Sequence, residues 1–226
     1  MLQSTMDQAF ETVQKDLSDI ASHLPWEDPK IYQRWLIQTY EYAVHSTRIL
    51  ALAGGFMPLN KTRLSNRFIK HSAEEKGHEL LLESDARNLG FDITTATPTP
   101  AAKAFHQSLY YWLGHGSSLG LMGWVLALEG FAVRNVPAVY KRCSLAYGPR
   151  ATSFLRVHSE EDPDHLEKAF EALRDFNQED TELITKTLQQ YGATYGNILK
   201  DMENDLLWDE FPRPSMGSES MRTYIH

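Results

Sequence analysis

Cysteine is nearly missing from this chain of 226 residues, in which Cys143 is the only thiol. One thiol cannot form an intramolecular disulfide, and it cannot supply a cysteine-based zinc or iron–sulfur site. A metal ion in this protein would therefore be held by histidines and carboxylates. That ligand set favours iron, manganese or zinc.

Long apolar runs and basic patches are missing as well. The longest apolar stretch, LGLMGWVLALEG, is short and interrupted by glycine, so we expect no membrane-spanning segment. The N-terminus lacks the basic and apolar regions of a secretory signal, so we expect a cytoplasmic protein. The formal net charge is −8 and no basic stripe carries interleaved aromatic residues, so we expect no nucleic-acid partner.

The alternation of apolar and polar residues that is typical of β-strands is also missing. Apolar residues instead recur at three- and four-residue steps, for example Met6, Phe10 and Val13, which predicts amphipathic helices. We predict an all-α, single-domain helical bundle over residues 1–210 and a loose C-terminal tail over residues 211–226. The predicted helices cover residues 4–23, 30–53, 60–89, 101–113, 119–145, 150–192 (one or two helices, broken near Pro163) and 194–208.

A candidate metal motif lies in the stretch RVHSEEDPDHLEKAF. His158, Asp162 and His165 are spaced by four and three residues, which places their side chains on one face of a helix. Three ordinary surface residues would fit the same spacing. Pro163 removes a backbone donor, so the helix either kinks there or begins anew with Asp162 as its N-cap. In the second case the Asp162 carboxylate would bind backbone amides instead of a metal.

A second candidate is the pair Glu75 and His78 in KHSAEEKGHELLLES. A carboxylate and an imidazole at i and i+3 are how helical bundles commonly present two ligands to one metal ion. Glu74 competes with Glu75 for this role, and His71 lies on the same face. A solvated, charged helix face is the simpler alternative.

Glu129 is a third candidate, because its neighbours in LGLMGWVLALEGFAV are nearly all apolar. A buried carboxylate without a partner is costly, so Glu129 needs a cation, a hydrogen bond or a raised pKa. An ion pair with Arg134 or Arg48 is the alternative to a metal.

Glu41 is the fourth candidate and lies in a similarly apolar helix, with His45 one turn later. We predict Glu41 as a metal ligand and His45 as a residue behind the ligands. Four separate helices then supply carboxylates and imidazoles. Together they provide enough ligands for two divalent ions bridged by carboxylates, and we expect Glu129 or Glu41 to form the bridge.

The ordered set ExxH, ALEG and HxxxDxxH resembles the heme-oxygenase-like di-iron oxidases and oxygenases, over roughly residues 30–185. The flanking stretches EEKGHELLLESDARNLG, LGLMGWVLALEGFA and SFLRVHSEEDPDHLEKA are similar to their ligand helices. Members run through the last motif without a proline, so Pro163 is a departure. The resemblance implies a seven-helix, TenA-like fold without heme. The metal ligands that it implies are Glu41, Glu75, His78, Glu129, His158, Asp162 and His165.

This resemblance implies two iron ions, often weakly bound, and O2 as co-substrate. The implied function is oxidation of a small organic substrate that is amino-acid-like or fatty-acid-like, and homodimers are common among proteins of this kind. Tyr40, Tyr42, Trp124 and His45 are candidates for lining the substrate pocket, although we favour core packing as the role of these residues. Arg48, Arg134 and Arg156 are candidates for binding a substrate carboxylate.

Two other functions remain open on the same fold. One is a cofactor-free, TenA-like hydrolase that uses a cysteine nucleophile, for which Cys143 is the only candidate. The other is a metal- or ligand-binding protein without catalysis.

Overall fold

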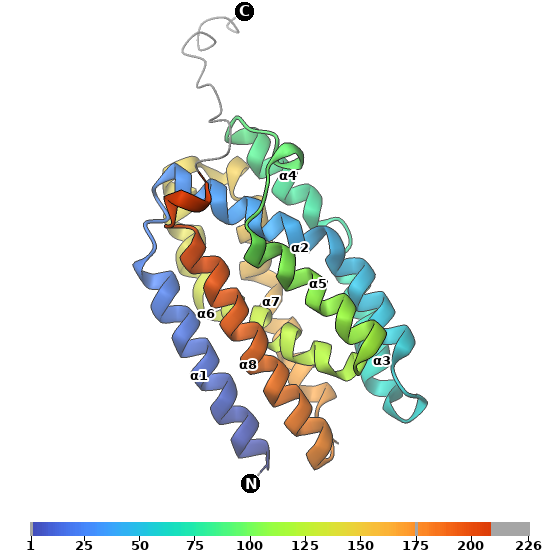
Figure 1. Cartoon of the computed structure of the whole chain (residues 1–226). Coiled ribbons are helices and arrows are strands. Elements are labelled where there is room, and N and C mark those ends of the chain that lie inside the picture. Colours follow the sequence, from blue (N-terminus) through green and yellow to red (C-terminus); the bar gives the residue numbers. More distant parts are fainter. Residues whose placement is uncertain (1, 175, 209–226) are drawn as a thin grey trace, which may run out of the picture.

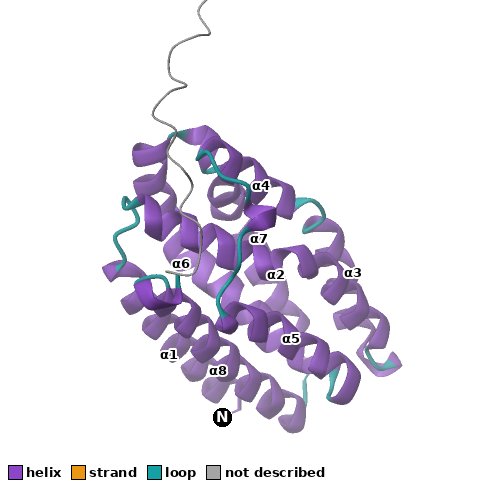
Figure 2. Ribbon diagram, turned by 45° about the horizontal axis from the view of Figure 1, so that its top comes forward, coloured by secondary structure: helices purple, strands orange, loops and turns teal. Residues whose placement is uncertain are grey.

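The computed structural model describes residues 2–174 and 176–208 of the chain. Within these ranges the protein is all-helical, as predicted, and Figure 2 shows long helices joined by short loops. The predicted tail 211–226 lies outside the described residues. The α-helices are α1 (Leu2–His23), α2 (Pro29–Phe56), α3 (Thr62–Glu74), α4 (His78–Asn88), α5 (Pro100–His115), α6 (Leu121–Tyr147), α7 (Ser153–Ala172) and α8 (Gln178–Asp201).

The helices pack around one apolar core. α1 lies along α8 on one flank of the bundle (Figure 1), and α6 packs against both α7 and α8. A Cβ atom at Gly123 of α6 would lie 2.3 Å from the backbone nitrogen of Leu188 in α8, so only glycine permits this close approach.

Helices α2 and α3 form an antiparallel pair. Two side-chain hydrogen bonds fix the position of α3 along α2. The Ser65 hydroxyl donates to the carbonyl of Gly54 at 2.7 Å, and the Ser72 hydroxyl donates to the carbonyl of Thr47 at 2.9 Å. These two bonds place the C-terminal end of α3 beside the middle of α2.

The single helix predicted over residues 60–89 is interrupted, which corrects that prediction. α3 ends at Glu74 and α4 begins at His78, because Gly77 has a φ of +92°, a left-handed conformation that ends a regular helix. This break also explains why eight α-helices are found in the described residues where the resemblance implied seven.

The C-terminal half also differs from the predicted pattern. The helix break expected near Pro163 does not occur, because α7 runs through Pro163 without interruption. The chain turns instead between residues 172 and 178, where Asn177 caps α8 with a capping box. α8 then continues through Gly192 to Asp201, so the predicted separate helix 194–208 is the end of a longer one.

One segment of the bundle, Ser118–Tyr147, is long and apolar enough to cross a membrane by length and composition alone. However, 78% of its apolar window is buried inside the protein. Packing against α7, α8 and α1 therefore accounts for its apolar character.

Candidate metal centre

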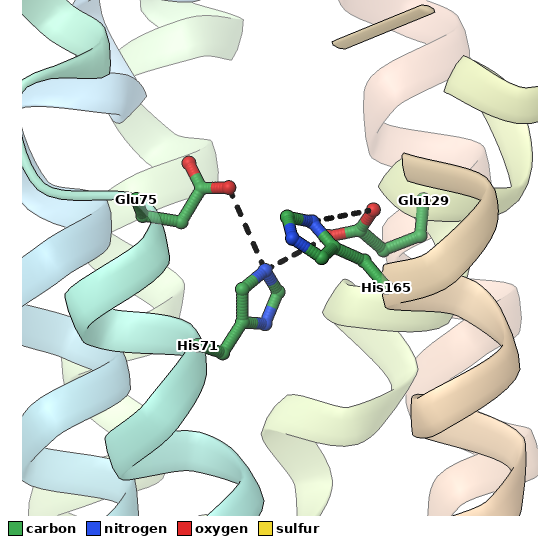
Figure 3. A group of neighbouring side chains, drawn as sticks. All are labelled: His71, Glu75, Glu129 and His165. Carbon is green, nitrogen blue, oxygen red and sulfur yellow. Dashed lines mark ion pairs between the residues drawn. The ribbon is translucent and has the colours of Figure 1, made fainter. Parts of the chain in front are cut away.

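Histidine and carboxylate side chains from four helices converge in the middle of the bundle. On one side, His71 Nε2 lies 3.0 Å from Glu129 Oε1 and 3.6 Å from Glu75 Oε1, and His165 Nδ1 lies 3.8 Å from Glu129 Oε2. Figure 3 shows these four side chains pointing toward one another across the gap between their helices. Their ligand atoms all lie within 4.8 Å of one another.

A second group adjoins the first and shares Glu75 with it. Glu75, His78 and His158 also have ligand atoms within 4.8 Å of one another, and His78 Nδ1 lies 3.2 Å from Glu75 Oε2. Asp162 touches both groups, since its carboxylate lies 2.9 Å from His158 Nδ1 and 3.6 Å from His165 Nδ1. We call this set the metal cluster; its members are His71, Glu75, His78, Glu129, His158, Asp162 and His165.

The cluster contains six of the seven ligands predicted from the sequence. Glu41 is not among them, and the predicted ligand role is not supported by its position. Its carboxylate lies instead 3.4 Å from His106 Nδ1, between α2 and α5. His71 completes the set in its place. His71 was visible in the sequence as a residue on the Glu75 face, but periodicity could not show that α3 turns this face toward α6.

The sequence left open whether Glu74 or Glu75 is the carboxylate that accompanies His78. In the structure, the Glu75 carboxylate lies with His78 in the cluster. The Glu74 carboxylate lies behind the cluster, where it accepts a hydrogen bond from Arg67 at 2.7 Å and faces His165 Nε2 at 3.5 Å. A carboxylate behind a ligating imidazole commonly fixes the orientation of the ring. Glu75 is the carboxylate that belongs to both groups, and it would be placed to hold both ions where we had expected Glu129 or Glu41 to do so.

Asp162 keeps its side chain free for the cluster. It does not cap a new helix, since α7 continues through Pro163. The N-terminus of α7 is capped from another helix by Asp85 of α4. Its buried carboxylate accepts hydrogen bonds from the backbone amides of Ser153 and Phe154, both at 2.9 Å. Asp85 thus holds the start of the helix that carries three cluster residues, a role that the sequence did not reveal.

Opposite charges dominate the electrostatics of the cluster. Burial disfavours protonation of His71, yet Glu129 and Glu75 raise its pKa to about 9. Burial also opposes the charge of His158, and Asp162 nonetheless raises its pKa to about 9. Despite burial, His71 and His78 hold the pKa of Glu75 well below its ordinary value. Burial, reinforced by Asp162, raises the pKa of Glu129.

The residues present fit a metal centre. Several buried polar atoms of the cluster have no partner with hydrogen-bond geometry, namely His71 Nε2, His78 Nδ1, Glu129 Oε2, His158 Nε2 and His165 Nδ1. Unpartnered buried polar atoms are rare in proteins, because each costs about 1–3 kcal/mol. Imidazole nitrogens and carboxylate oxygens that converge without bonding each other are the ligand types that iron and manganese take.

Comparison with protein families agrees with this geometry. A family model described as an iron-containing redox enzyme matches residues 33–195, a range that includes the whole metal cluster. The chain belongs to the iron-containing redox enzyme family. No curated protein shows significant similarity to this iron-containing redox enzyme.

Solved structures share the fold of this iron-containing redox enzyme. A domain of unknown function with a heme oxygenase-like fold from Shewanella denitrificans is 23% identical, with a TM-score of 0.76, over 90% of this chain and 94% of that one. A TenA homologue from Pseudomonas syringae is 11% identical, with a TM-score of 0.74, over 87% and 91%. A TenA homologue from Pyrococcus furiosus is 14% identical, with a TM-score of 0.68, over 89% and 100%. At these identities the likeness shows the predicted heme-oxygenase-like fold.

A cavity adjoins the metal cluster of this iron-containing redox enzyme. It encloses about 680 Å³ of space not filled by atoms, its open mouth included, and is lined by α2, α3, α6, α7 and α8. Of the four residues considered as candidates for the pocket lining, Tyr42 and Trp124 line it, whereas Tyr40 and His45 do not. Five cluster residues form part of its wall, and most of the remaining wall is aliphatic or aromatic. A substrate in this cavity would therefore lie directly against the metal ligands.

Proposed function

We propose that this protein is a non-heme di-iron oxidase or oxygenase that uses O2 to oxidise a small organic molecule. The observation that carries the proposal is the convergence of six histidine and carboxylate side chains in two adjoining groups, five of which have a buried atom without a hydrogen-bond partner. The shared Glu75 and the two adjoining groups support two metal ions more than one. When bound, the two irons would supply the electrons that O2 activation requires.

The protein's own residues would hold and tune this centre. Glu74, paired with Arg67, fixes the His165 ring from behind. Asp162 holds His158 through its Nδ1, which leaves His158 Nε2 unpartnered for a metal ion. The apolar wall of the cavity offers few polar groups that would hold water beside the ligands, which would limit side reactions during oxidation.

The test is an anaerobic Fe(II) titration of metal-free protein, followed by exposure to O2. We expect about two irons per chain, as in di-iron carboxylate bundles, and O2 consumption that depends on iron. Absence of iron uptake would overturn the proposal. The matched control is a Glu75→Gln variant, which keeps the size of the side chain and removes the charge of the shared carboxylate.

The cofactor-free hydrolase has less support from this structure. Cys143 is fully buried, does not line the cavity, and burial raises the pKa of its thiol to about 12. A nucleophilic cysteine needs a thiolate that the substrate can reach. We expect a thiol-alkylating reagent to leave the folded protein unmodified at pH 8, and rapid alkylation would revive this alternative.

A further inference from the structure

The residues that line the cavity beside the metal cluster restrict the charge of the ligand that can bind there. Apart from the five cluster residues and Ser46, every lining residue is aliphatic or aromatic, and no lysine or arginine is among them. Two of the arginines considered for a substrate carboxylate are paired elsewhere, Arg134 with Glu11 and Arg156 with Glu160. An anionic group in the apolar part of the cavity would have no cationic partner.

The lining of the cavity extends along two helices. Along α2 the lining residues run from Trp35 to Leu50, a span of roughly 22 Å along the helix at 1.5 Å per residue. Along α6 they run from Trp124 to Val136, with Glu129 of the metal cluster between them. The cluster thus lies beside the middle of this lining and not at one end of it, which suits an elongated occupant.

Two indole N–H groups in the wall of the cavity, those of Trp35 and Trp124, have no hydrogen-bond partner. Both residues are buried, and Trp124 lies on α6, the helix that also carries Glu129 of the metal cluster. Buried indole N–H groups usually find an acceptor, and a hydrogen bond left unmade is unfavourable. The N–H of Trp124 is therefore available to an occupant of the cavity.

We infer that the cavity takes an elongated, uncharged substrate whose hydrogen-bond acceptor, a carbonyl, amide or hydroxyl oxygen, lies against Trp124 Nε1. A carboxylate in this part of the cavity would face apolar groups and neutral indole and hydroxyl donors, which desolvates the charge without pairing it. An ammonium group would find only the neutral hydroxyl oxygens of Ser46, Tyr42 and Tyr195 along this wall, and at the cluster it would compete with the metal ions. The claim that this ligand is a substrate rests on the proposed function. The claim that the cavity binds such a molecule does not depend on it.

The test compares three probes that share one alkyl chain and differ in the charge of the head group. Octanamide, octanoate and octylammonium are titrated calorimetrically into the metal-free full-length chain at pH 10, above the raised pKa values of His71 and His158, so that neither imidazole of the cavity wall carries a charge that pairs with octanoate. We expect octanamide to bind at least about tenfold more tightly than either charged probe, since a charge buried without a partner costs more than a lost hydrogen bond. Tighter binding of octanoate, or no binding of octanamide, would overturn the inference.

A substitution tests whether the acceptor of the ligand binds to the Trp124 N–H. Trp124→Phe keeps an aromatic ring and removes only the N–H, so octanamide affinity should fall about three- to tenfold, the range for one neutral hydrogen bond. The matched control is Trp112→Phe, since Trp112 packs against Gly116 and Gly120 outside the cavity lining. Equal octanamide affinity in the wild type and Trp124→Phe would contradict the assignment.

Ala132→Leu, which narrows the cavity from α6, should weaken octanamide binding without removing any polar group.

A second arm repeats the titrations with anaerobic Fe(II)-loaded protein, because iron could bind a carboxylate head group directly. We expect octanamide to remain the tighter ligand, and reversal of the order in favour of octanoate would overturn the inference. The metal-free arm keeps the two proposals separable. Octanamide binding without iron uptake would overturn the proposed function alone, whereas iron uptake with a preference for octanoate would overturn only the uncharged substrate.

Discussion

Two groups of histidine and carboxylate side chains lie in this bundle, and they differ in geometry. In the metal cluster, ligand atoms from α3, α4, α6 and α7 converge in two adjoining groups, within each of which they lie within 4.8 Å of one another. The second group, which we call the α2–α5 group, consists of Glu41, His45, His106 and Tyr110. There the two imidazole rings stack at 4.2 Å between centroids and are nearly parallel, with an interplanar angle of 12°.

Electrostatics separate the two groups as clearly as geometry does. Carboxylates raise the pKa of His71 and His158 to about 9 in the metal cluster. In the α2–α5 group, burial lowers the pKa of both His45 and His106. Several carboxylates that surround an imidazole outweigh the cost of burying its charge, whereas a single half-buried carboxylate does not. The presence of suitable residue types therefore does not make a metal site; their convergence does.

The largest expected effect comes from replacing the shared carboxylate. Glu75→Ala should abolish iron binding by both adjoining groups, because both contain Glu75. Glu41→Ala is the matched control from the α2–α5 group and should leave iron stoichiometry unchanged. Iron analysis after anaerobic loading measures both, with circular dichroism to check that each variant is folded. Loss of iron in Glu41→Ala would show that Glu41 is a ligand after all.

The second effect concerns pH. Because the pKa values of His71 and His158 are raised to about 9, both imidazoles carry a proton at pH 7 in the metal-free protein, and a metal ion has to displace it. Metal affinity should therefore increase as the pH rises from 7 toward 9, by about tenfold per pH unit for each proton displaced, and then level off. Titrations with Mn(II), which resists oxidation by air, measure this slope. A pH-independent affinity would contradict the raised pKa values.

A smaller effect is expected at the cap of α7. Asp85→Ala removes a buried acceptor from the amides of Ser153 and Phe154, and should lower the free energy of unfolding by about 1–3 kcal/mol. Iron should also bind more weakly, because the helix that carries His158, Asp162 and His165 loses its anchor. Asp28→Ala, which removes a cap from α2, serves as the control for stability without an effect on iron. Unchanged iron affinity in Asp85→Ala would show that α7 holds its position without this cap.

The smallest effect is expected in the α2–α5 group. Tyr110→Phe removes the hydroxyl that lies 3.1 Å from His45 Nδ1, at a cost of about 0.5–1.5 kcal/mol in the free energy of unfolding. Iron stoichiometry and affinity should not change, because neither residue belongs to the metal cluster. Denaturant unfolding and iron titration test the two statements separately, and a change in iron affinity would link the two groups.

Helical class and most of the ligands could be predicted from local patterns. Three- and four-residue periodicity predicted the helices, and the spacing of His158, Asp162 and His165 put them on one face. Glu129 stood out because a lone carboxylate among apolar residues needs a partner. Helix boundaries were harder, since Gly77 interrupts a helix that periodicity predicted as continuous and α7 tolerates a proline that was expected to break it.

Local patterns in the chain were enough to predict that it is helical, that histidines and carboxylates would hold a metal, and which residues of α6 and α7 were available to do so. The choice between Glu41 and His71, in contrast, depended on how the helices pack. Both lie on amphipathic helices beside suitable partners, and periodicity describes a helix face without saying what the face meets. The packing of α3 against α2 turns His71 toward Glu129, whereas α5 covers Glu41 with His106. Contacts between distant segments depend on how whole helices pack, and no local pattern contains that information.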